Sequence, residues 1–333
     1  MKKKIIYVSI PKKNIIQVFK FNKKKIKKIQ EIFTNGEVQP IKLYKKKNIL
    51  YAGVRNSSRI IIYKINSKGL LKFIKEVYTI GSPNHLSIDK KKKYLFNSSY
   101  GENCITCHKL LNNGILKKTY KTKNNILGCH SSISELKSKI LFFTSLKKDK
   151  IFICKIKKIK SSFHKKIKYL KSEKNSGPRH LEIHPNNKFL YVINELNANI
   201  LVWKINKKIH KIKKNYIQKI DIVPNFFGKK WAADIHIHPS GNFLYSCERT
   251  TSKITLFYVN SKNGTLKFIK TYNTEKQPRS FKLDKEGKFL IISGQKSNSI
   301  SIYKINNTNG FLKKINQFKT LEEPLWIEIL TLN

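Results

Sequence analysis

Arginine and acidic residues are scarce in this chain of 333 residues. The sequence has 70 lysines and arginines against 19 acidic residues, a formal net charge of +51, yet only five are arginine, at positions 55, 59, 179, 249 and 279. Proteins that read phosphates or bases usually depend on the forked guanidinium group. The lysines are scattered and form no stripe with interleaved aromatics. We therefore expect no specific nucleic-acid partner, only nonspecific, salt-sensitive binding of polyanions.

Long apolar runs are also absent. No segment approaches the roughly 20 apolar residues of a membrane span, and the apolar run in MKKKIIYVSIPKK is too short for a signal peptide. Cysteine occurs five times, an odd number, which in a chain without a secretory signal predicts reduced thiols. We expect a cytoplasmic protein, a monomer or weak oligomer, that does not bind membranes.

Apolar residues at helical spacing are missing too, and a repeat takes their place. Each copy begins with a tight segment, often containing proline, that leads into the first strand; we call this segment the approach. A short apolar segment, a polar turn, a strand, a loop and another strand follow it. The clearest copies begin at Gly177, Trp231 and Gln277. Repeats of about 40–50 residues made of alternating strands are typical of four-stranded propeller blades. The strand signals predict an all-β protein.

The two ends of the chain look like parts of one repeat. The chain begins with KKIIYVSIPKKNIIQVFKFN, which matches the second and third strands of a copy, and ends with EEPLWIEIL, which matches an approach and a first strand. Joining them completes a seventh blade and leaves no unpaired sheet edge at the closure. We predict one domain, residues 1–333: a seven-bladed β-propeller with four antiparallel strands per blade, closed by N-terminal strands that pair with the C-terminal strand.

Two short motifs suggest haem or metal. Residues 104–108 spell C-x-x-C-H, a haem-attachment signature. In the repeat, however, they begin an ordinary third strand, where residues three apart point to opposite faces. Asp234, His236 and His238 alternate on one strand and are ligand types for zinc, but His238 repeats the position of His184 before a proline, which indicates a structural role. We predict no metal and no cofactor.

The repeat also predicts which residues share a face of the ring. In an antiparallel blade, the start of the first strand and the end of the second lie at the same end. The position after the second strand is occupied by Arg55, Tyr100, Leu146, Glu195, Arg249, Gln295 and, in the cut blade, Pro11. The equivalent approach position is occupied by Asn84, His130, Arg179, Ala233 and Arg279.

Four of the five arginines lie at these positions: Arg55, Arg179, Arg249 and Arg279. They could tie neighbouring blades together through backbone carbonyls. For the set, convergence on an anionic ligand is the better explanation, because guanidinium binds carboxylate or phosphate in a planar, bidentate way that lysine cannot copy. Arg59, in the first blade's loop, is a weaker fifth member.

His130 and His180 lie at the approaches of successive blades, and Glu195 follows the second strand of the blade that begins with Arg179. Such a set could supply general acid–base catalysis with arginine stabilising the charge. Alternatively, His130 caps a strand and Glu195 only pairs with Arg179, since buried ion pairs also occur without catalysis. Spacing alone leaves both interpretations open.

Several segments resemble the family of seven-bladed-propeller lactonases, and the resemblance covers essentially the whole chain. The matching segments are SPNHLSID, GCHSS, GPRHLEIHP, NELN, WAADIHIHP, ERT, QPR and GQKS. The resemblance implies hydrolysis of 6-phosphoglucono-1,5-lactone to 6-phosphogluconate, the second step of the oxidative pentose phosphate pathway, without a cofactor. The family also includes fungal enzymes that make or open a carboxymuconate lactone in the same central cleft.

The catalytic group of that lactonising branch falls on His130, Arg179, Glu195 and Arg279. On this basis Glu195 or His130 activates a water, Arg179 stabilises the oxyanion, and Arg279, together with Arg249 or Arg55, holds the phosphate. We further predict that the substrate is bound by residues from the same face: Arg55, His180, Asp234, His236, Arg249 and Gln295.

Two other functions stay open from the sequence. The first is a lactonase or lactonising enzyme for another anionic lactone, such as a carboxymuconolactone, because arginine fits a carboxylate as well as a phosphate. The second is a non-catalytic propeller scaffold that binds protein or nucleic acid on its top face. A small set of arginine, histidine and glutamate at the rim of a channel favours the enzyme.

Overall fold

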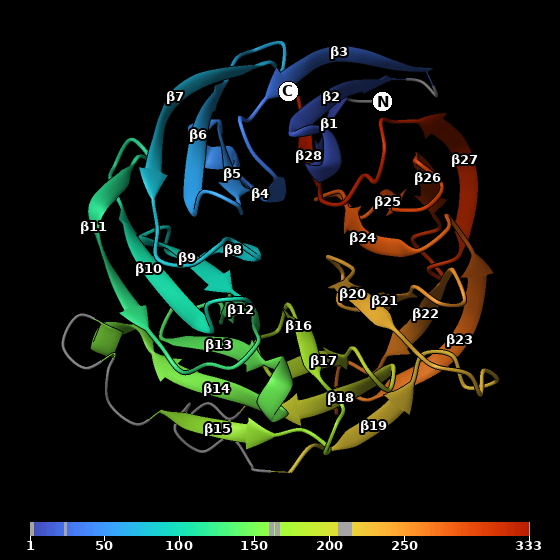
Figure 1. Ribbon diagram of the computed structural model, residues 1–333. Coiled ribbons are helices and arrows are strands. Elements are labelled where there is room, and N and C mark those ends of the chain that lie inside the picture. Colours follow the sequence, from blue (N-terminus) through green and yellow to red (C-terminus); the bar gives the residue numbers. More distant parts are fainter. Residues whose placement is uncertain (1–2, 23–24, 160–162, 164–166, 206–214, 333) are drawn as a thin grey trace.

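The chain forms a closed ring of seven four-stranded antiparallel sheets, or blades (Figure 1). The computed structural model describes residues 3–22, 25–159, 163, 167–205 and 215–332. The ends of the predicted domain, residues 1–2 and 333, lie outside this described part. The predicted all-β, seven-bladed propeller is confirmed.

In six of the blades the strands follow one another in sequence from the ring axis outward, and in the seventh the order is β28, β1, β2, β3. The first three blades, in chain order, contain β4 (Val38–Tyr44), β5 (Ile49–Val54), β6 (Arg59–Ile65) and β7 (Leu71–Tyr78); β8 (His85–Ile88), β9 (Tyr94–Ser99), β10 (Cys104–Leu110) and β11 (Leu116–Lys123); and β12 (Cys129–Ser134), β13 (Ile140–Ser145), β14 (Lys150–Lys155) and β15 (Lys168–Lys171).

The other four blades follow the same plan. They contain β16 (Pro178–Ile183), β17 (Phe189–Asn194), β18 (Asn199–Lys204) and β19 (Gln218–Asp221); β20 (Ala232–Ile237), β21 (Phe243–Glu248), β22 (Lys253–Val259) and β23 (Leu266–Asn273); β24 (Pro278–Leu283), β25 (Phe289–Gly294), β26 (Ser299–Ile305) and β27 (Leu312–Lys319); and β28 (Ile327–Thr331), β1 (Lys4–Ile10), β2 (Ile15–Asn22) and β3 (Lys25–Phe33). In the described part of the chain, no helix has the length and apolar character to cross a membrane.

The seventh blade is assembled from both ends of the chain, as predicted. Strand β28 pairs with β1 from Lys4↔Thr331 to Val8↔Ile327, and Figure 1 shows the two ends of the chain beside each other. The buried Lys4 also reaches the preceding blade, where its Nζ lies 2.6 Å from Oδ2 of Asp284. Because separating a buried ion pair leaves an uncompensated charge, this contact helps hold the closure.

Neighbouring blades are tied together by a repeated tyrosine–glycine hydrogen bond. The hydroxyl of Tyr191 on β17 donates to the carbonyl of Gly264 in the next blade at 3.0 Å, and Tyr245 donates likewise to Gly310 at 2.7 Å. Gly264 has a φ of +81° and an added Cβ would lie 2.2 Å from Phe189, so only glycine fits there. Each buried hydrogen bond of this kind contributes about 0.5–1.5 kcal/mol.

Apolar side chains from adjacent blades fill the space between them, so the core is distributed around the ring. One cluster joins Phe142 of β13 to Leu190 and Trp203 of the next blade, all fully buried. This packing of each blade only on its neighbours explains how 333 residues fold around one axis when a single core usually stops growing at about 250–300 residues.

The structure places the C-x-x-C-H motif and the two histidines before proline where the repeat predicts them. The C-x-x-C-H residues begin the ordinary third strand β10. His184 and His238 have the repeated structural role that was predicted. Nε2 of each lies 3.0 Å from a carbonyl of the next blade, that of Gly241 for His184 and that of Gly287 for His238.

Candidate active site

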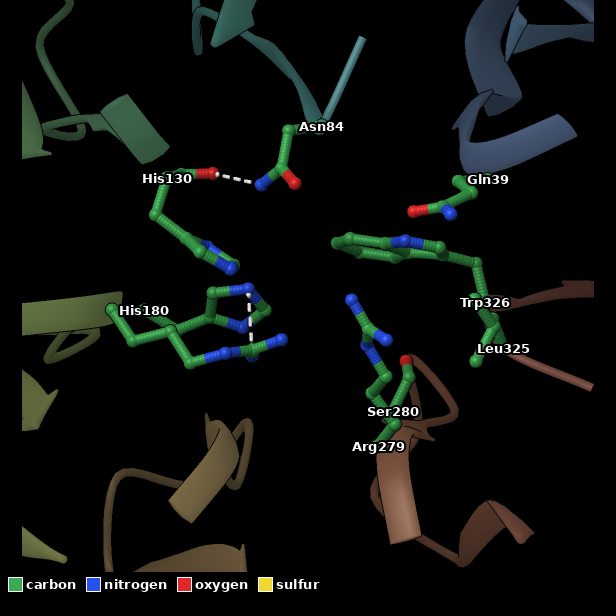
Figure 2. Close-up of a pocket in the computed structure, with 9 residues that line it drawn as sticks. Gln39, Asn84, His130, His180, Arg279, Ser280, Leu325 and Trp326 are labelled. Atoms are coloured by element: carbon green, nitrogen blue, oxygen red, sulfur yellow. Dashed lines mark hydrogen bonds between the residues drawn. The ribbon is translucent and has the colours of Figure 1, made fainter. Parts of the chain in front are cut away.

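A pocket lies at the centre of the ring, among the innermost strands (Figure 2). The innermost strands and their approach segments supply its walls. Its lining residues are Gln39, Asn84, His130, Arg179, His180, Arg279, Ser280, Leu325 and Trp326.

Most of these residues come from a single position of the repeat, which we call the pocket ring. The ring has one member per blade, and six of the seven line the pocket. Its members are Gln39, Asn84, His130, Arg179, Ala233, Arg279 and Leu325. The predicted approach position therefore identifies the pocket.

A β-bulge in five of the blades explains why consecutive residues can both face the pocket. In β16, Pro178 pairs with Asn194 and His180 with Ile193, so Arg179 is an extra residue on the inner strand. Arg279 is the extra residue of β24 in the same way. Because a bulge breaks the strict alternation of a strand, it turns Arg179 and His180 toward the same cavity.

Arg179 is buried at the pocket wall and is bound on two sides. Its Nε lies 2.8 Å from Oε2 of Glu195. Its Nη1 donates to the carbonyl of Ala233 and, at 3.2 Å, to Nε2 of His180. The remaining amino group, Nη2, has no hydrogen bond to a residue that the structure describes. That group is therefore available to a bound molecule.

Glu195 lies behind Arg179 and does not line the pocket. Its Oε1 accepts from Nε1 of Trp231 at 3.0 Å and lies 3.2 Å from Nη2 of Arg249. Burial alone would raise the pKa of this carboxyl, but the guanidinium groups of Arg179 and Arg249 outweigh it, so the pKa lies below its ordinary value. Both oxygens are thus occupied and weakly basic.

Arg249 is held by backbone carbonyls, as the structural alternative for these arginines expects, but the carbonyls are those of its own blade and only Glu195 belongs to the neighbouring one. Its Nη2 donates to the carbonyl of Ala232 at 2.9 Å, and its guanidinium lies 3.6 Å from the centre of the Trp231 ring. Burial, with the charge of Arg179, lowers the pKa of Arg249 to about 9. Arg59 is likewise held by carbonyls, since Nη2 donates to Thr34 at 3.0 Å and to Asn35 at 2.7 Å.

Arg279 differs from both, because its guanidinium points into the pocket and makes no hydrogen bond or ion pair with the described residues (Figure 2). Burial and then the charge of Arg179 lower its pKa to about 10, so it stays cationic at neutral pH. Arg55 lies near it at the more exposed rim, with Nη1 3.8 Å from Oε1 of Glu37.

His130 projects its ring into the pocket beside His180, with ring centroids 5.1 Å apart (Figure 2). Nδ2 of Asn84 donates to its backbone carbonyl at 2.9 Å and fixes its strand. Burial, followed by the charge of Arg179, holds the pKa of His130 well below 6.5. The imidazole is therefore neutral at neutral pH and can accept a proton.

Trp326 forms an aromatic wall opposite the histidines (Figure 2). Its ring centroid lies 5.8 Å from that of His180 and 5.5 Å from that of His85. Burial and the charge of Arg179 lower the pKa of His180 to about 4. The pocket thus has one apolar face and one face made of guanidinium and imidazole groups.

The remaining predicted site residues lie around the pocket without lining it. Asp234 is buried behind His180, with Oδ1 2.6 Å from Nδ1 of that ring. His236 is two residues further along the same strand, between Asp234 and Glu182. Gln295 lies at the rim and donates to Oε2 of Glu323 at 3.2 Å. Their roles in binding substrate stay predictions.

A second ring of side chains encircles the axis three residues further along each inner strand, and we call it the charged ring. Its seven members pair with equivalent residues of the second strands: Lys42, Ser87, Ile133, Glu182, His236, Lys282 and Glu328. Oε1 of Glu328 lies 3.3 Å from Nζ of Lys42 and 3.8 Å from Nζ of Lys282. Within the described residues, no group of three or more His, Cys, Asp or Glu side chains could hold a metal ion.

Sequence reasoning missed Gln39, Ser280, Leu325 and Trp326. The approach of the first blade, VQPIK, is shorter than the others, so spacing alone does not assign its member of the pocket ring. The C-terminal EEPLWIEIL was recognised as an approach and a first strand. Counting along it by the same rule would have placed Leu325 and Trp326 beside Arg279.

Several known proteins resemble this chain in sequence or in fold. A family model described as "Lactonase, 7-bladed beta-propeller" matches residues 5–329. A 6-phosphogluconolactonase of Buchnera aphidicola subsp. Schizaphis graminum (strain Sg) is 43% identical over 283 residues, 84% of this chain and 85% of that protein. One from Erwinia tasmaniensis is 33% identical over 284 residues, 85% of each chain. The fold also matches a periplasmic gluconolactonase of Pseudomonas aeruginosa, with TM-score 0.87 and 19% identity over 99% of this chain and all of that one.

Proposed function

The chain belongs to the family of seven-bladed β-propeller lactonases, and we infer that it hydrolyses 6-phosphoglucono-1,5-lactone to 6-phosphogluconate. The observation that carries this inference is the charge of the pocket. The guanidinium groups of Arg179 and Arg279 face a neutral His130, and Glu195 balances only part of their charge. A bound anion compensates such an excess of buried cationic donors, because unpaired buried charge is costly.

In the mechanism that we propose, His130 is the general base. It takes a proton from a water whose oxygen attacks the lactone carbonyl carbon. The ring C–O bond then breaks, and the protonated His130 returns the proton to the leaving ring oxygen. The resulting acid loses its proton to solvent. A substrate phosphate brings negative charge into the pocket, which raises the pKa of a neighbouring imidazole toward the range where general bases work best.

Arg179 is the oxyanion stabiliser in this proposal. Its Nη2 makes no hydrogen bond with the described residues, while Glu195 and the carbonyl of Ala233 hold the rest of the guanidinium. A donor held in advance stabilises developing charge without reorganising during the reaction. Glu195, whose oxygens already contact Arg179, Arg249 and Trp231, acts by orienting these groups. Of the two candidate bases, geometry therefore favours His130.

Arg279 holds the phosphate in this proposal, with Arg55 beyond it at the rim. Arg279 has no partner among the described residues, so its whole fork is available for bidentate binding of a phosphate. Trp326 provides the flat apolar surface on which the sugar ring can rest. The reaction consumes only water, so we propose that the enzyme needs no cofactor.

We propose that the enzyme works in the cytoplasm. All five cysteines are buried, and no disulfide joins them within the described chain. Reduced thiols are the usual state in that compartment.

The test is a coupled assay in which oxidation of glucose 6-phosphate supplies the lactone and the acid product is detected. Because the lactone also opens spontaneously, the enzyme must raise the rate above a protein-free control in proportion to its concentration. Comparison with unphosphorylated gluconolactone separates this function from that of a lactonase for other anionic lactones. We expect a strong preference for the phosphorylated substrate, and equal rates would contradict the phosphate site.

A further inference from the structure

Asp234 has an unusual number of hydrogen-bond donors for a residue outside the pocket. It is 2% exposed and lies on β20, the inner strand between the two strands that carry Arg179 and Arg279. Its Oδ1 accepts from the backbone N–H of Ile235 at 3.0 Å and contacts Nδ1 of His180 at 2.6 Å. Its Oδ2 accepts from the N–H of Phe281 at 3.3 Å and lies 3.4 Å from Nε2 of His236.

The partners of His180 determine which ring nitrogen carries its proton. A carboxylate can only accept and a guanidinium can only donate. Nδ1 faces Asp234, so it must carry the proton, and Nε2 faces Nη1 of Arg179, so it must be the acceptor. Asp234 thus fixes His180 in the tautomer that receives an Arg179 N–H.

This chain of contacts leads directly to the oxyanion donor. Arg179 is held at Nε by Glu195 and at Nη1 by Ala233 and His180, which leaves Nη2 for the pocket. If His180 carried its proton on Nε2 instead, two N–H donors would face each other at 3.2 Å. The guanidinium would have to move away, and Nη2 would move with it.

Asp234 also reaches the other arginine of the pocket. It accepts the N–H of Phe281, which is two residues after Arg279 on β24. On its remaining side, His236 lies between Asp234 and Oε1 of Glu182, with Nδ1 2.7 Å from the latter. Because both neighbours accept hydrogen bonds, both nitrogens of His236 donate, and the resulting cation keeps Asp234 ionised.

We propose that Asp234 is a positioning residue for the hydrolysis: through His180 it orients Arg179, and through the backbone of β24 it sets the place of Arg279. This inference rests on the hydrolytic function proposed above. It differs from a role in binding substrate, because Asp234 does not line the pocket.

The main variant is Asp234→Asn, which keeps the shape but replaces one acceptor oxygen by a donor. The four N–H groups around Asp234 then cannot all be satisfied. We expect kcat to fall about 100-fold, since small misplacements of catalytic groups cost that much, and KM to rise by less than the roughly 10- to 100-fold expected from removing Arg279 itself. The matched control is Asp89→Asn. Asp89 is equally buried but accepts only backbone N–H groups of its own turn, from Lys91, Lys93 and Tyr94.

A double-mutant cycle distinguishes positioning from simple loss of stability. His180→Phe removes the ring through which Asp234 acts on Arg179. If the proposal is right, Asp234→Asn lowers kcat by a clearly smaller factor in the His180→Phe background than in the wild type, because the route through His180 is already lost and only the route through β24 remains. The control Asp89→Asn lowers the melting temperature but leaves kcat per folded protein unchanged in either background.

Nitrogen NMR of the imidazole rings provides a test that does not require the variant to fold. We expect His180 in the wild-type protein to be neutral with its proton on Nδ1. The proposal is overturned by a proton on Nε2, by folded Asp234→Asn with kcat within about threefold of wild type, or by losses that multiply in the double variant. An inactive wild-type protein would instead overturn the proposed function itself.

Discussion

The pocket ring and the charged ring encircle the same axis but differ in whether their charged side chains have partners. In the charged ring, Lys42 and Lys282 share the carboxylate of Glu328, and His236 lies against Glu182. In the pocket ring, Arg279 has no partner among the described residues. Because an unpaired buried charge destabilises a fold, its presence in only one of the two rings indicates that the pocket ring is completed by a ligand.

The backbone differs between the two rings as well. The charged ring lies on regular strand ladders, such as Lys282↔Ile291. In five of the seven blades the pocket ring coincides with a bulge, a feature that is common next to active sites because it redirects side chains. Regular pairing thus supports the fold, and the irregular residue in each bulged blade supports the chemistry.

The largest effect is expected from removing the proposed base of the pocket ring. His130→Gln keeps a polar side chain of similar length but cannot take up a proton. We expect kcat to fall about 10²- to 10⁴-fold, the usual contribution of a general base, as measured by initial rates in the coupled assay. A folded variant with near-normal kcat would remove His130 from the chemistry.

The pH dependence of the wild-type enzyme tests the same group. Burial lowers the pKa of His130 well below 6.5, so the free enzyme keeps its base neutral through neutral pH. We expect kcat/KM to be level there and to fall only in acid, as His130 becomes protonated below its pKa. His130→Gln is expected to lose this acid limb. A fall that begins above pH 6.5 would point to another group.

The next prediction compares the loss of activity on removing Arg179, in an approach, with the loss on removing Arg59, at the start of β6 in the first blade. Arg179→Ala removes the oxyanion donor, and we expect kcat/KM to fall about 10²- to 10³-fold. Arg59→Ala is the control, because Arg59 is held by carbonyls and Glu76 away from the pocket. Equal losses in the two variants would mean that Arg179 only supports the fold.

The repeat in the sequence predicts the positions of the residues changed in these variants. Other features of the site could not be predicted from the sequence. The repeat places a residue after each second strand and at each approach, and so brings His130, Arg179 and Arg279 to one pocket. It says nothing of the bulges, because an extra residue in a strand depends on how the neighbouring strand pairs. The contacts of Asp234 with His180 and Phe281 cross two blade boundaries, and no spacing within one repeat contains them.

A smaller and more selective effect is expected from Arg279→Ala. Hydrogen bonds to charged groups contribute about 1.5–3 kcal/mol, so KM for the phosphorylated lactone should rise about 10- to 100-fold. Unphosphorylated gluconolactone lacks the group that Arg279 is proposed to bind, and its kinetics should change little. Equal losses for both substrates would show that Arg279 acts on the lactone ring instead.

The smallest effect on activity is expected in the charged ring. Glu328→Gln leaves Lys42 and Lys282 without their shared carboxylate, which is 8% exposed. Since both lysines keep some contact with water, we expect a loss of about 1–3 kcal/mol in the free energy of unfolding, seen as a lower melting temperature at low salt. Glu322→Gln, at an exposed pair with Lys12, should change it by less than about 1 kcal/mol. We expect kcat/KM of both variants to stay within about twofold (~0.4 kcal/mol) of wild type. A large loss of activity in folded Glu328→Gln would break the contrast, because the charged ring would then be part of the site.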